Sequence, residues 1–264
     1  MQSWKIFTHS LRMIFDNLVA ALKVSAVLYI IQFVVVSYFM LTYGEVLQAL
    51  VKFSQDPDPA KVPPIIPAGF AGSMILMGGI FLITSLWIAV MWHRYILRNE
   101  TTSALVPKFH PSEIMAYFGK TVQLGLILLV VYTGTLLVAG LVLGIIAQVI
   151  GLTNLDLVFR AMLGISILYF SYRFSAVLPG AALAKPITFK EAWVKTAPAS
   201  GVILGLAVII VIFTQLVQIP SMLNPDPTSA INIAYEFVLG WIVMLLGVSI
   251  LTTLYGIYIE GREI

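Results

Sequence analysis

The sequence predicts an all-α, polytopic membrane protein: six transmembrane helices in three hairpins, each hairpin preceded by a cytoplasmic interfacial amphipathic helix. Three observations lead to this class. Hydrophobic residues make up 60% of the 264 residues and charged residues only 10%, whereas a soluble domain has about 25% charged residues. The apolar residues fall in six long runs, and Lys and Arg gather in only some of the segments between them. A soluble fold could not bury so much apolar surface, so lipid must cover much of it.

The six spans are predicted from apolar runs that carry almost no charge. A transmembrane helix needs roughly 20 consecutive apolar residues, and an ionisable side chain near its centre costs about 2.5–3.5 kcal/mol. The runs that satisfy this requirement lie at residues 24–43, 69–92, 121–147, 152–172, 200–220 and 232–258. The first run begins too far into the chain, and is too long, for a cleavable signal peptide, so we expect it to remain as a span.

The distribution of Lys and Arg predicts the orientation. Of the 15 basic residues, twelve fall on one side of the predicted membrane and three, Lys52, Lys61 and Arg160, on the other. Segments that stay in the cytoplasm carry the excess of Lys and Arg. Both termini are therefore expected in the cytoplasm, and the simplest location is a bacterial cytoplasmic (inner) membrane.

Three segments are predicted to be interfacial helices. The first has Trp4, Phe7, Leu11, Phe15, Leu18 and Leu22 on one helical face, with charged residues along its flank. Such a helix lies in the headgroup plane. The second candidate is residues 112–120. The third is residues 188–195, in which Thr188 and Glu191 have the spacing of a capping box.

The three interfacial helices, with matching span ends and turns, suggest a single membrane domain. It would be built from three repeated units, at about residues 1–98, 99–179 and 180–264. The second and fourth spans close with similar residues, Trp92-His93-Arg94-Tyr95 and Ser171-Tyr172-Arg173-Phe174. In the predicted turns at residues 56–59 and 224–227, Asp or Asn alternates with proline. We therefore predict an internal repeat of one interfacial helix and one hairpin.

The Trp92-His93-Arg94-Tyr95 ending and the stretch from Val177 to Trp193 resemble a family of uncharacterised six-span bacterial inner-membrane proteins. The layout is also similar to the membrane domain joined to some glycerophosphodiester phosphodiesterases, although the catalytic barrel of those proteins has no counterpart in this chain. The resemblance implies a fold and a location. It carries no active-site residues to this sequence.

Span four contains the candidate intramembrane polar site. Between Arg160 and Arg173 the uncharged helix is only about 18 Å long, against a hydrocarbon core of about 30 Å. Either both arginines snorkel outward, or one lies inside the membrane and pairs with Asp156, one helical turn from Arg160. Snorkelling is favoured. Gln215 and Gln218 share a face of span five and complete the candidate site, although packing through interhelical hydrogen bonds is favoured for them.

Aromatic and basic residues at span ends predict interfacial anchors, which are Trp4, Trp92, His93, Arg94, Tyr172, Arg173 and Trp193. An anchoring role is favoured over a catalytic one for His93. Two small-residue patterns, Gly140-x-x-x-Gly144 and Gly201-x-x-x-Gly205, permit close approach of a neighbouring helix. The sequence does not indicate which helix that neighbour is.

The sequence predicts no catalytic residues, no cofactor and no metal site. The chain has no cysteine and three scattered histidines, and its net charge of +3 is too small to indicate nucleic-acid binding. We expect a non-enzymatic protein that acts as a scaffold, assembly factor or accessory subunit. Its expected partners are the lipid bilayer, anionic headgroups, and a second membrane protein or another copy of itself. The alternatives are a transporter or channel for a small or lipidic substrate and, less favoured, an intramembrane enzyme acting on lipid.

Overall fold

The computed structural model describes residues 1–55, 62–101, 106–150, 155–223 and 229–263. Within these ranges the chain is helical and contains no strand. The segments 56–59 and 224–227, on which part of the predicted repeat rests, lie outside the described residues. The elements are α1 (Gln2–Phe15), α2 (Leu18–Gln55), α3 (Phe70–Arg98), α4 (Pro111–Ile150), α5 (Asp156–Phe174), α6 (Val177–Ala182), α7 (Phe189–Thr196), the 3₁₀ turn η1 (Ala197–Ala199), α8 (Ser200–Leu223) and α9 (Ala230–Tyr258).

Six helical segments in the described part of the chain are long and apolar enough to cross a membrane, which confirms the predicted number of spans. They are Leu18–Ser54, Phe70–Arg98, Pro111–Val149, Leu157–Ala182, Phe189–Leu223 and Ala230–Tyr258. Two of the helices are longer than a single membrane crossing requires. With 38 residues α2 is about 57 Å long, and with 40 residues α4 is about 60 Å long. Both extend well beyond a hydrocarbon core of about 30 Å.

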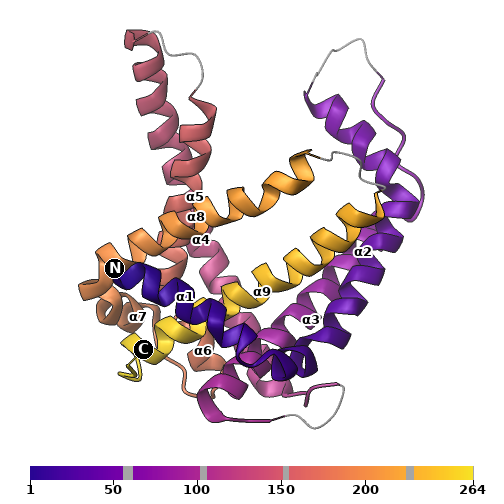
Figure 1. Cartoon of the computed structure of the whole chain (residues 1–264). Helices are drawn as coiled ribbons and strands as arrows, with labels where there is room; N and C mark the ends of the chain where they lie inside the picture. The colour runs from indigo at the N-terminus through magenta and orange to yellow at the C-terminus, as the bar shows by residue number, and fades with distance from the viewer. Residues whose placement is uncertain (56–61, 102–105, 151–154, 224–228, 264) are drawn as a thin grey trace.

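The helices meet at one end of the molecule and separate toward the other (Figure 1). We call the first end the base: it holds α1, α6, α7, both ends of the chain and the adjoining ends of the longer helices. Two hydrophobic clusters fill it, one around Trp92 and Leu254 and one around Val90 and Ala181. At the other end, which we call the open end, many apolar side chains of α2, α4 and α8 are exposed. The packed core therefore lies at the base.

The span pairs are packed unequally. α2 packs mainly on α3, and α4 packs mainly on α5. In contrast, α8 packs mainly on α5 and α1, and α9 packs mainly on α1 and α3. The third pair therefore differs from the expected hairpin, because α1 contacts both of its helices.

α1 is part of the packed base. Ile6, Phe7 and Ile14 are buried against α8 and α9, and the Ser10 and Thr253 hydroxyls lie 2.9 Å apart. The predicted apolar face is divided: Phe7 lies in this contact, whereas Trp4 is 57% exposed and Phe15 is exposed too. One side of α1 therefore contacts protein, and the adjoining apolar side is left open.

The other two predicted interfacial helices have different structures. Residues 112–120 form the first turns of α4 without a break before the span. Residues 189–196 form a separate helix, α7, because Pro198 and the 3₁₀ turn η1 interrupt the chain before α8. The predicted capping box is confirmed: the Glu191 amide donates to the Thr188 hydroxyl at 3.1 Å, and the Thr188 amide donates to the Glu191 carboxylate at 2.7 Å.

Polar side chains within the spans link neighbouring helices. The Trp92 indole of α3 donates to Ser249 of α9 at 2.9 Å. The Gln32 amide of α2 donates to Thr84 of α3 at 2.8 Å. Because these groups are buried in an apolar environment, their hydrogen bonds fix which helix faces align.

Candidate functional site

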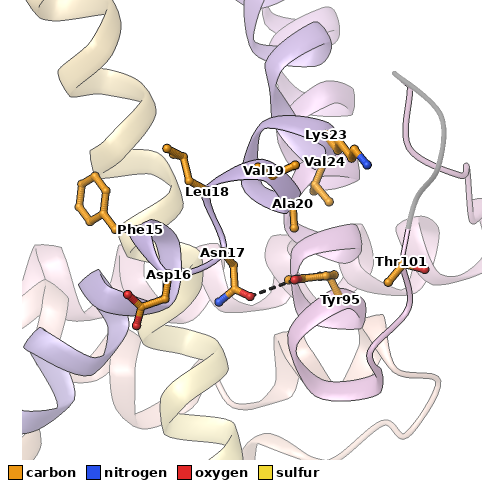
Figure 2. A pocket seen from close by; sticks show the side chains of 10 residues that line it. All are labelled: Phe15, Asp16, Asn17, Leu18, Val19, Ala20, Lys23, Val24, Tyr95 and Thr101. Carbon is orange, nitrogen blue, oxygen red and sulfur yellow. Dashed lines mark hydrogen bonds between the residues drawn. The ribbon is translucent and has the colours of Figure 1, made fainter.

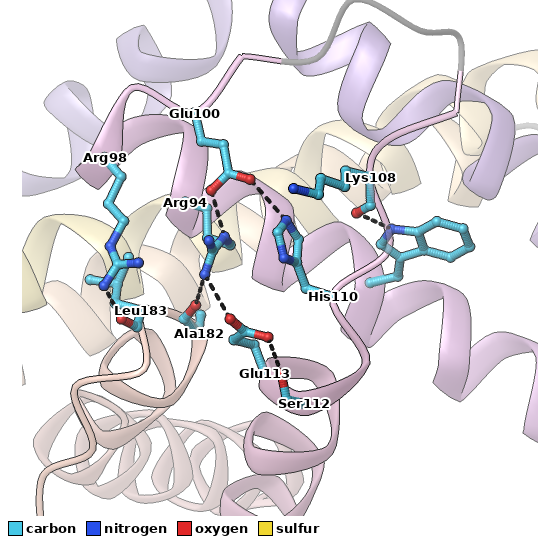
Figure 3. Close-up of polar contacts among 10 residues, drawn as sticks. Arg94, Arg98, Glu100, Lys108, His110, Ser112, Glu113, Ala182 and Leu183 are labelled. Carbon is cyan, nitrogen blue, oxygen red and sulfur yellow. Dashed lines mark hydrogen bonds and ion pairs between the residues drawn. The ribbon is translucent and has the colours of Figure 1, made fainter.

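The first candidate site surrounds Arg94, near the end of α3 at the base (Figure 3). Its guanidinium donates to the Glu100 carboxylate at 2.7 Å and to Glu113 at 3.3 Å. It also donates to the Ala182 carbonyl of α6 at 3.1 Å. His110 contacts the other oxygen of Glu100 at 2.8 Å. One buried arginine therefore joins α3, the segment after it, the start of α4 and the end of α6. We call this group the Arg94 clamp.

The end of α3 explains why Glu100 reaches Arg94. Asn99 adopts the left-handed conformation (φ 54°), which Asn tolerates well and which commonly ends helices. The Glu100 amide then bonds back to the Arg94 carbonyl at 3.3 Å, so the chain reverses and the Glu100 side chain faces the arginine. Burial alone would raise the pKa of the Glu100 carboxyl, but hydrogen bonds and charge from Arg94 and His110 outweigh it. The pKa of Glu100 therefore lies below its ordinary range.

The second candidate site surrounds Arg173, near the end of α5, where its side chain is buried. The guanidinium donates to the Thr196 hydroxyl at 2.8 Å and to the Trp193 carbonyl at 2.8 Å, both on α7. It also donates to Tyr169 at 2.9 Å and to Ser200 at 3.2 Å. Its central carbon lies 3.8 Å from the centroid of the Trp193 ring, a cation–π distance. Arg173 thus joins α5 to α7 and α8.

The predicted anchors divide between the core and the surface. Trp92 and His93 are fully buried, and His93 contacts Thr252 at 2.8 Å and Tyr117 at 3.3 Å. Arg94, Tyr172 and Arg173 are buried as well. Trp193 is half-buried on α7, and Trp4 is exposed on α1. Most of these side chains contact protein, because α1, α6 and α7 cover the span ends.

A cavity of about 460 Å³ lies at the base beside the junction of α1 and α2 (Figure 2). The Tyr95 hydroxyl donates to Asn17 across it at 2.9 Å. Asp16 and Lys23 also line the cavity, but Figure 2 shows their side chains pointing away from each other. The cavity therefore does not bring charges together on one ligand position.

A larger groove, of about 670 Å³, lies between α5, α8 and α9. Arg160 and Gln215 line it, so the structure brings these two predicted residues together. Gln218 is exposed and is not part of the lining, and Arg173 lies at the base. The side chain of Asp156 lies outside the described residues, so the predicted pair with Arg160 is not described. The predicted polar site is thus divided between a groove and a base contact.

The sequence analysis missed the partners of both buried arginines. Glu100, His110 and Glu113 surround Arg94, and Tyr169 and Ser200 accompany Arg173. One signal was available, because Glu113 stands in the first turn of α4, where a carboxylate is favoured. Among the residues that the structure describes, no group of three or more His, Asp or Glu is placed to hold a metal ion.

The chain was compared with protein-family models, curated proteins and solved structures. No family model, curated protein or solved structure matches it. The resemblance to six-span bacterial inner-membrane proteins therefore stays a prediction.

Proposed function

We propose that the chain is a non-enzymatic protein of the bacterial inner membrane that serves as a scaffold, assembly factor or accessory subunit. α4 is the observation that carries this proposal. Only 6% of the residues in the most apolar stretch of its membrane-crossing segment are buried, and a Cβ placed on Gly134, Gly140 or Gly144 would meet no atom within 4 Å. A span with open small-residue positions suits close packing with a helix from another protein.

In the proposed orientation the base lies at the cytoplasmic surface and both termini are cytoplasmic. The twelve basic residues of the predicted inner side support this placement. They lie on α1, on α7, near the base ends of the longer helices, or on connecting segments at the base. Lys52 and Arg160 lie toward the open end. The exposed Trp4 and Phe15, with the basic residues nearby, form a surface that suits anionic headgroups.

We also propose that the domain is a threefold repeat. In support, Arg94 at the end of α3 contacts Glu113 at the start of the second unit, and Arg173 at the end of α5 contacts α7 in the third. The end of α9 contacts α1 of the first unit through Thr253 and Ser10. Polar side-chain contacts therefore join each span pair to the unit that follows, and join the third pair to the first unit.

The partner proposal can be tested by photo-crosslinking in native membranes. A photoreactive residue at Leu137 or Leu141 of α4, each 67% exposed, should give a discrete adduct with another membrane protein. An adduct of twice the 29.0 kDa chain mass would identify a second copy. Gly140→Leu should abolish the adduct because it fills the helix contact. The matched control, Gly78→Leu on α3, also has open space and should leave the adduct unchanged. Lipid adducts alone at both positions would contradict the proposal.

A second candidate function is transport of a small or lipidic substrate. The groove between α5, α8 and α9 favours it, because the groove lies between spans and combines an apolar lining with Arg160 and Gln215. Vesicle uptake or lipid-transfer assays with Arg160→Gln would distinguish it from the first function. The accessory-subunit function predicts no transport by the purified protein and no effect of this variant.

A further inference from the structure

The groove between α5, α8 and α9 has the size and lining of a ligand site. Its volume of about 670 Å³ lies in the range of roughly 300–1,000 Å³ that is usual for such sites. Leu163, Ile167, Ile210 and Leu246 contribute to a lining that is mainly apolar. Because these residues belong to membrane-crossing helices, a ligand would enter from the hydrocarbon, and an acyl chain fits the apolar walls.

Two polar side chains of the groove, Arg160 and Gln215, lie at nearly the same height. The Arg173–Ser200 contact of 3.2 Å aligns α5 and α8 at the base. From it, Arg160 lies about 20 Å along α5 and Gln215 about 22 Å along α8, at a helical rise of roughly 1.5 Å per residue. The two side chains therefore approach the groove at nearly the same level, far from the base. A ligand whose chain points toward the base would place its headgroup beside them.

The charge of Arg160 determines which class of lipid headgroup the groove would bind. Arg160 is the one charged side chain among the residues described as lining the groove. A guanidinium binds phosphate oxygens with paired hydrogen bonds, and an amide such as Gln215 can supply a further donor. We infer that the groove binds an anionic phospholipid of the surrounding membrane, with one acyl chain between α5, α8 and α9 and the phosphate beside Arg160.

Anionic phospholipid is thus the ligand class proposed for the groove of the second candidate function, transport. The inference rests on that proposed function, because both require the groove to open to lipid. It does not depend on the proposed partner interface on α4. Loss of lipid binding would therefore leave the crosslinking result on α4 unaffected.

A space-filling variant separates the groove from the rest of the lipid-covered surface. Gly247 of α9 lines the groove, and a Cβ built on it meets no atom within 4 Å. Gly247→Phe should therefore fold and place its ring in the space that the acyl chain would occupy. Gly78→Phe is the matched control, because Gly78 is equally open but belongs to α3 and does not line the groove.

The binding test is native mass spectrometry of the full chain in mild detergent, titrated with dioleoyl-phosphatidylglycerol, dioleoyl-phosphatidylcholine or inorganic phosphate. One phosphatidylglycerol should bind about tenfold more tightly than phosphatidylcholine, a difference of about 1.4 kcal/mol. The choline cation of phosphatidylcholine offsets the phosphate charge that Arg160 would meet, whereas phosphatidylglycerol keeps a net negative charge. Inorganic phosphate, which has no acyl chain, should not bind measurably. Arg160→Gln should remove the preference, and Gly247→Phe should remove the tight site, while Gly78→Phe retains both.

Several results would overturn the inference. Equal affinity for the two lipids would exclude headgroup recognition by charge. Unchanged phosphatidylglycerol binding in Gly247→Phe would place the lipid outside the groove. Binding of inorganic phosphate as tight as that of phosphatidylglycerol would show an anion site that does not use the acyl chain.

Discussion

Arg94 and Arg173 stand at corresponding places near the base, but their charges are stabilised by different chemistry. Arg94 contacts two carboxylates, Glu100 and Glu113. In the described part of the chain, Arg173 is held by neutral oxygen atoms and by the Trp193 ring. A planar guanidinium can donate in several directions while stacking on an aromatic ring, whereas a lysine ammonium cannot. The identity of the cation therefore matters most at Arg173.

We predict that Arg173→Lys lowers the stability of the protein although the charge is kept. The lysine would lose the bond to Thr196 or Trp193 and the stacking, and a hydrogen bond to a charged group contributes about 1.5–3 kcal/mol. Thermal unfolding in detergent measures the change. Arg12→Lys, the same substitution at an exposed position of α1, is the control and should have little effect. Equal unfolding temperatures for the two variants would contradict the assigned role of Arg173.

The Arg94 clamp predicts a dependence of stability on pH. The pKa of Glu100 is lowered in the folded protein, so its contribution is present above the pKa of the unfolded chain and is lost as pH falls through the folded pKa. Glu100→Gln should therefore be less stable than wild type near neutral pH and converge with it in acid.

Unfolding temperatures measured from about pH 7 down to about pH 3 would test this convergence, since the range covers the titration of carboxyl groups. Glu45→Gln, at an exposed position of α2, is the matched control and should follow wild type throughout. A gap between Glu100→Gln and wild type that widens on acidification would have the wrong sign for the clamp.

At the scale of the elements, two glycines of α8 differ in how closely another helix approaches them. A Cβ on Gly205 would lie 2.6 Å from the Ser3 hydroxyl of α1, whereas a Cβ on Gly201 would meet no atom within 4 Å. Ser3 also donates to the Val202 carbonyl at 2.8 Å. Gly205 therefore lets α1 approach α8, which explains one half of the Gly201-x-x-x-Gly205 pattern.

We predict that Gly205→Leu displaces α1, while Gly201→Leu does not. Both variants replace glycine with leucine in the same helix, so the gain in helix propensity is shared. Hydrogen exchange of α1 peptides, measured by mass spectrometry, should become faster only in Gly205→Leu, because overpacking costs about 1–3 kcal/mol. Similar exchange in the two variants would show that this contact does not hold α1 in place.

The elements show how far the sequence determines the fold. Six spans could be predicted, because charge-free runs of sufficient length have few alternatives to crossing a membrane. The capping box at Thr188 and Glu191 could also be predicted, because its hydrogen bonds are local. The burial of Trp92 and His93 could not, because lipid-facing and protein-facing sides of a span are both apolar. For the same reason, the sequence gives no sign that α9 covers Trp92.

The candidate sites were predictable to a smaller extent. Arg160 and Gln215 could be singled out as polar residues in spans, but their shared groove depends on the alignment of α5 with α8. The partners of Arg94 depend on a left-handed Asn99 and on the position of α6. The Glu100 contact is local but requires that unusual backbone conformation, whereas the contacts with Glu113 and Ala182 join segments that are distant in the sequence.

At the scale of the whole molecule, the packed core and the exposed apolar faces lie at opposite ends of the helices. The base contains the hydrophobic clusters, both arginine sites and the hydrogen bonds from α1 to α8 and α9. The open end presents the exposed apolar faces of α4 and the end of the groove between α5, α8 and α9 that holds Arg160 and Gln215. We interpret the base as the part that fixes the helices, and the open end as the part that meets lipid or a partner.

Labelling of single cysteines tests the placement of the base at the cytoplasmic surface, on which these proposals depend. The chain has no cysteine, so one introduced residue reports alone. Lys52→Cys near the open end and Lys190→Cys on α7 are both exposed, and intact cells are treated with a membrane-impermeant maleimide. We predict labelling of Lys52→Cys in intact cells and of Lys190→Cys only after permeabilisation. Labelling of Lys190→Cys in intact cells, with Lys52→Cys protected, would contradict the account.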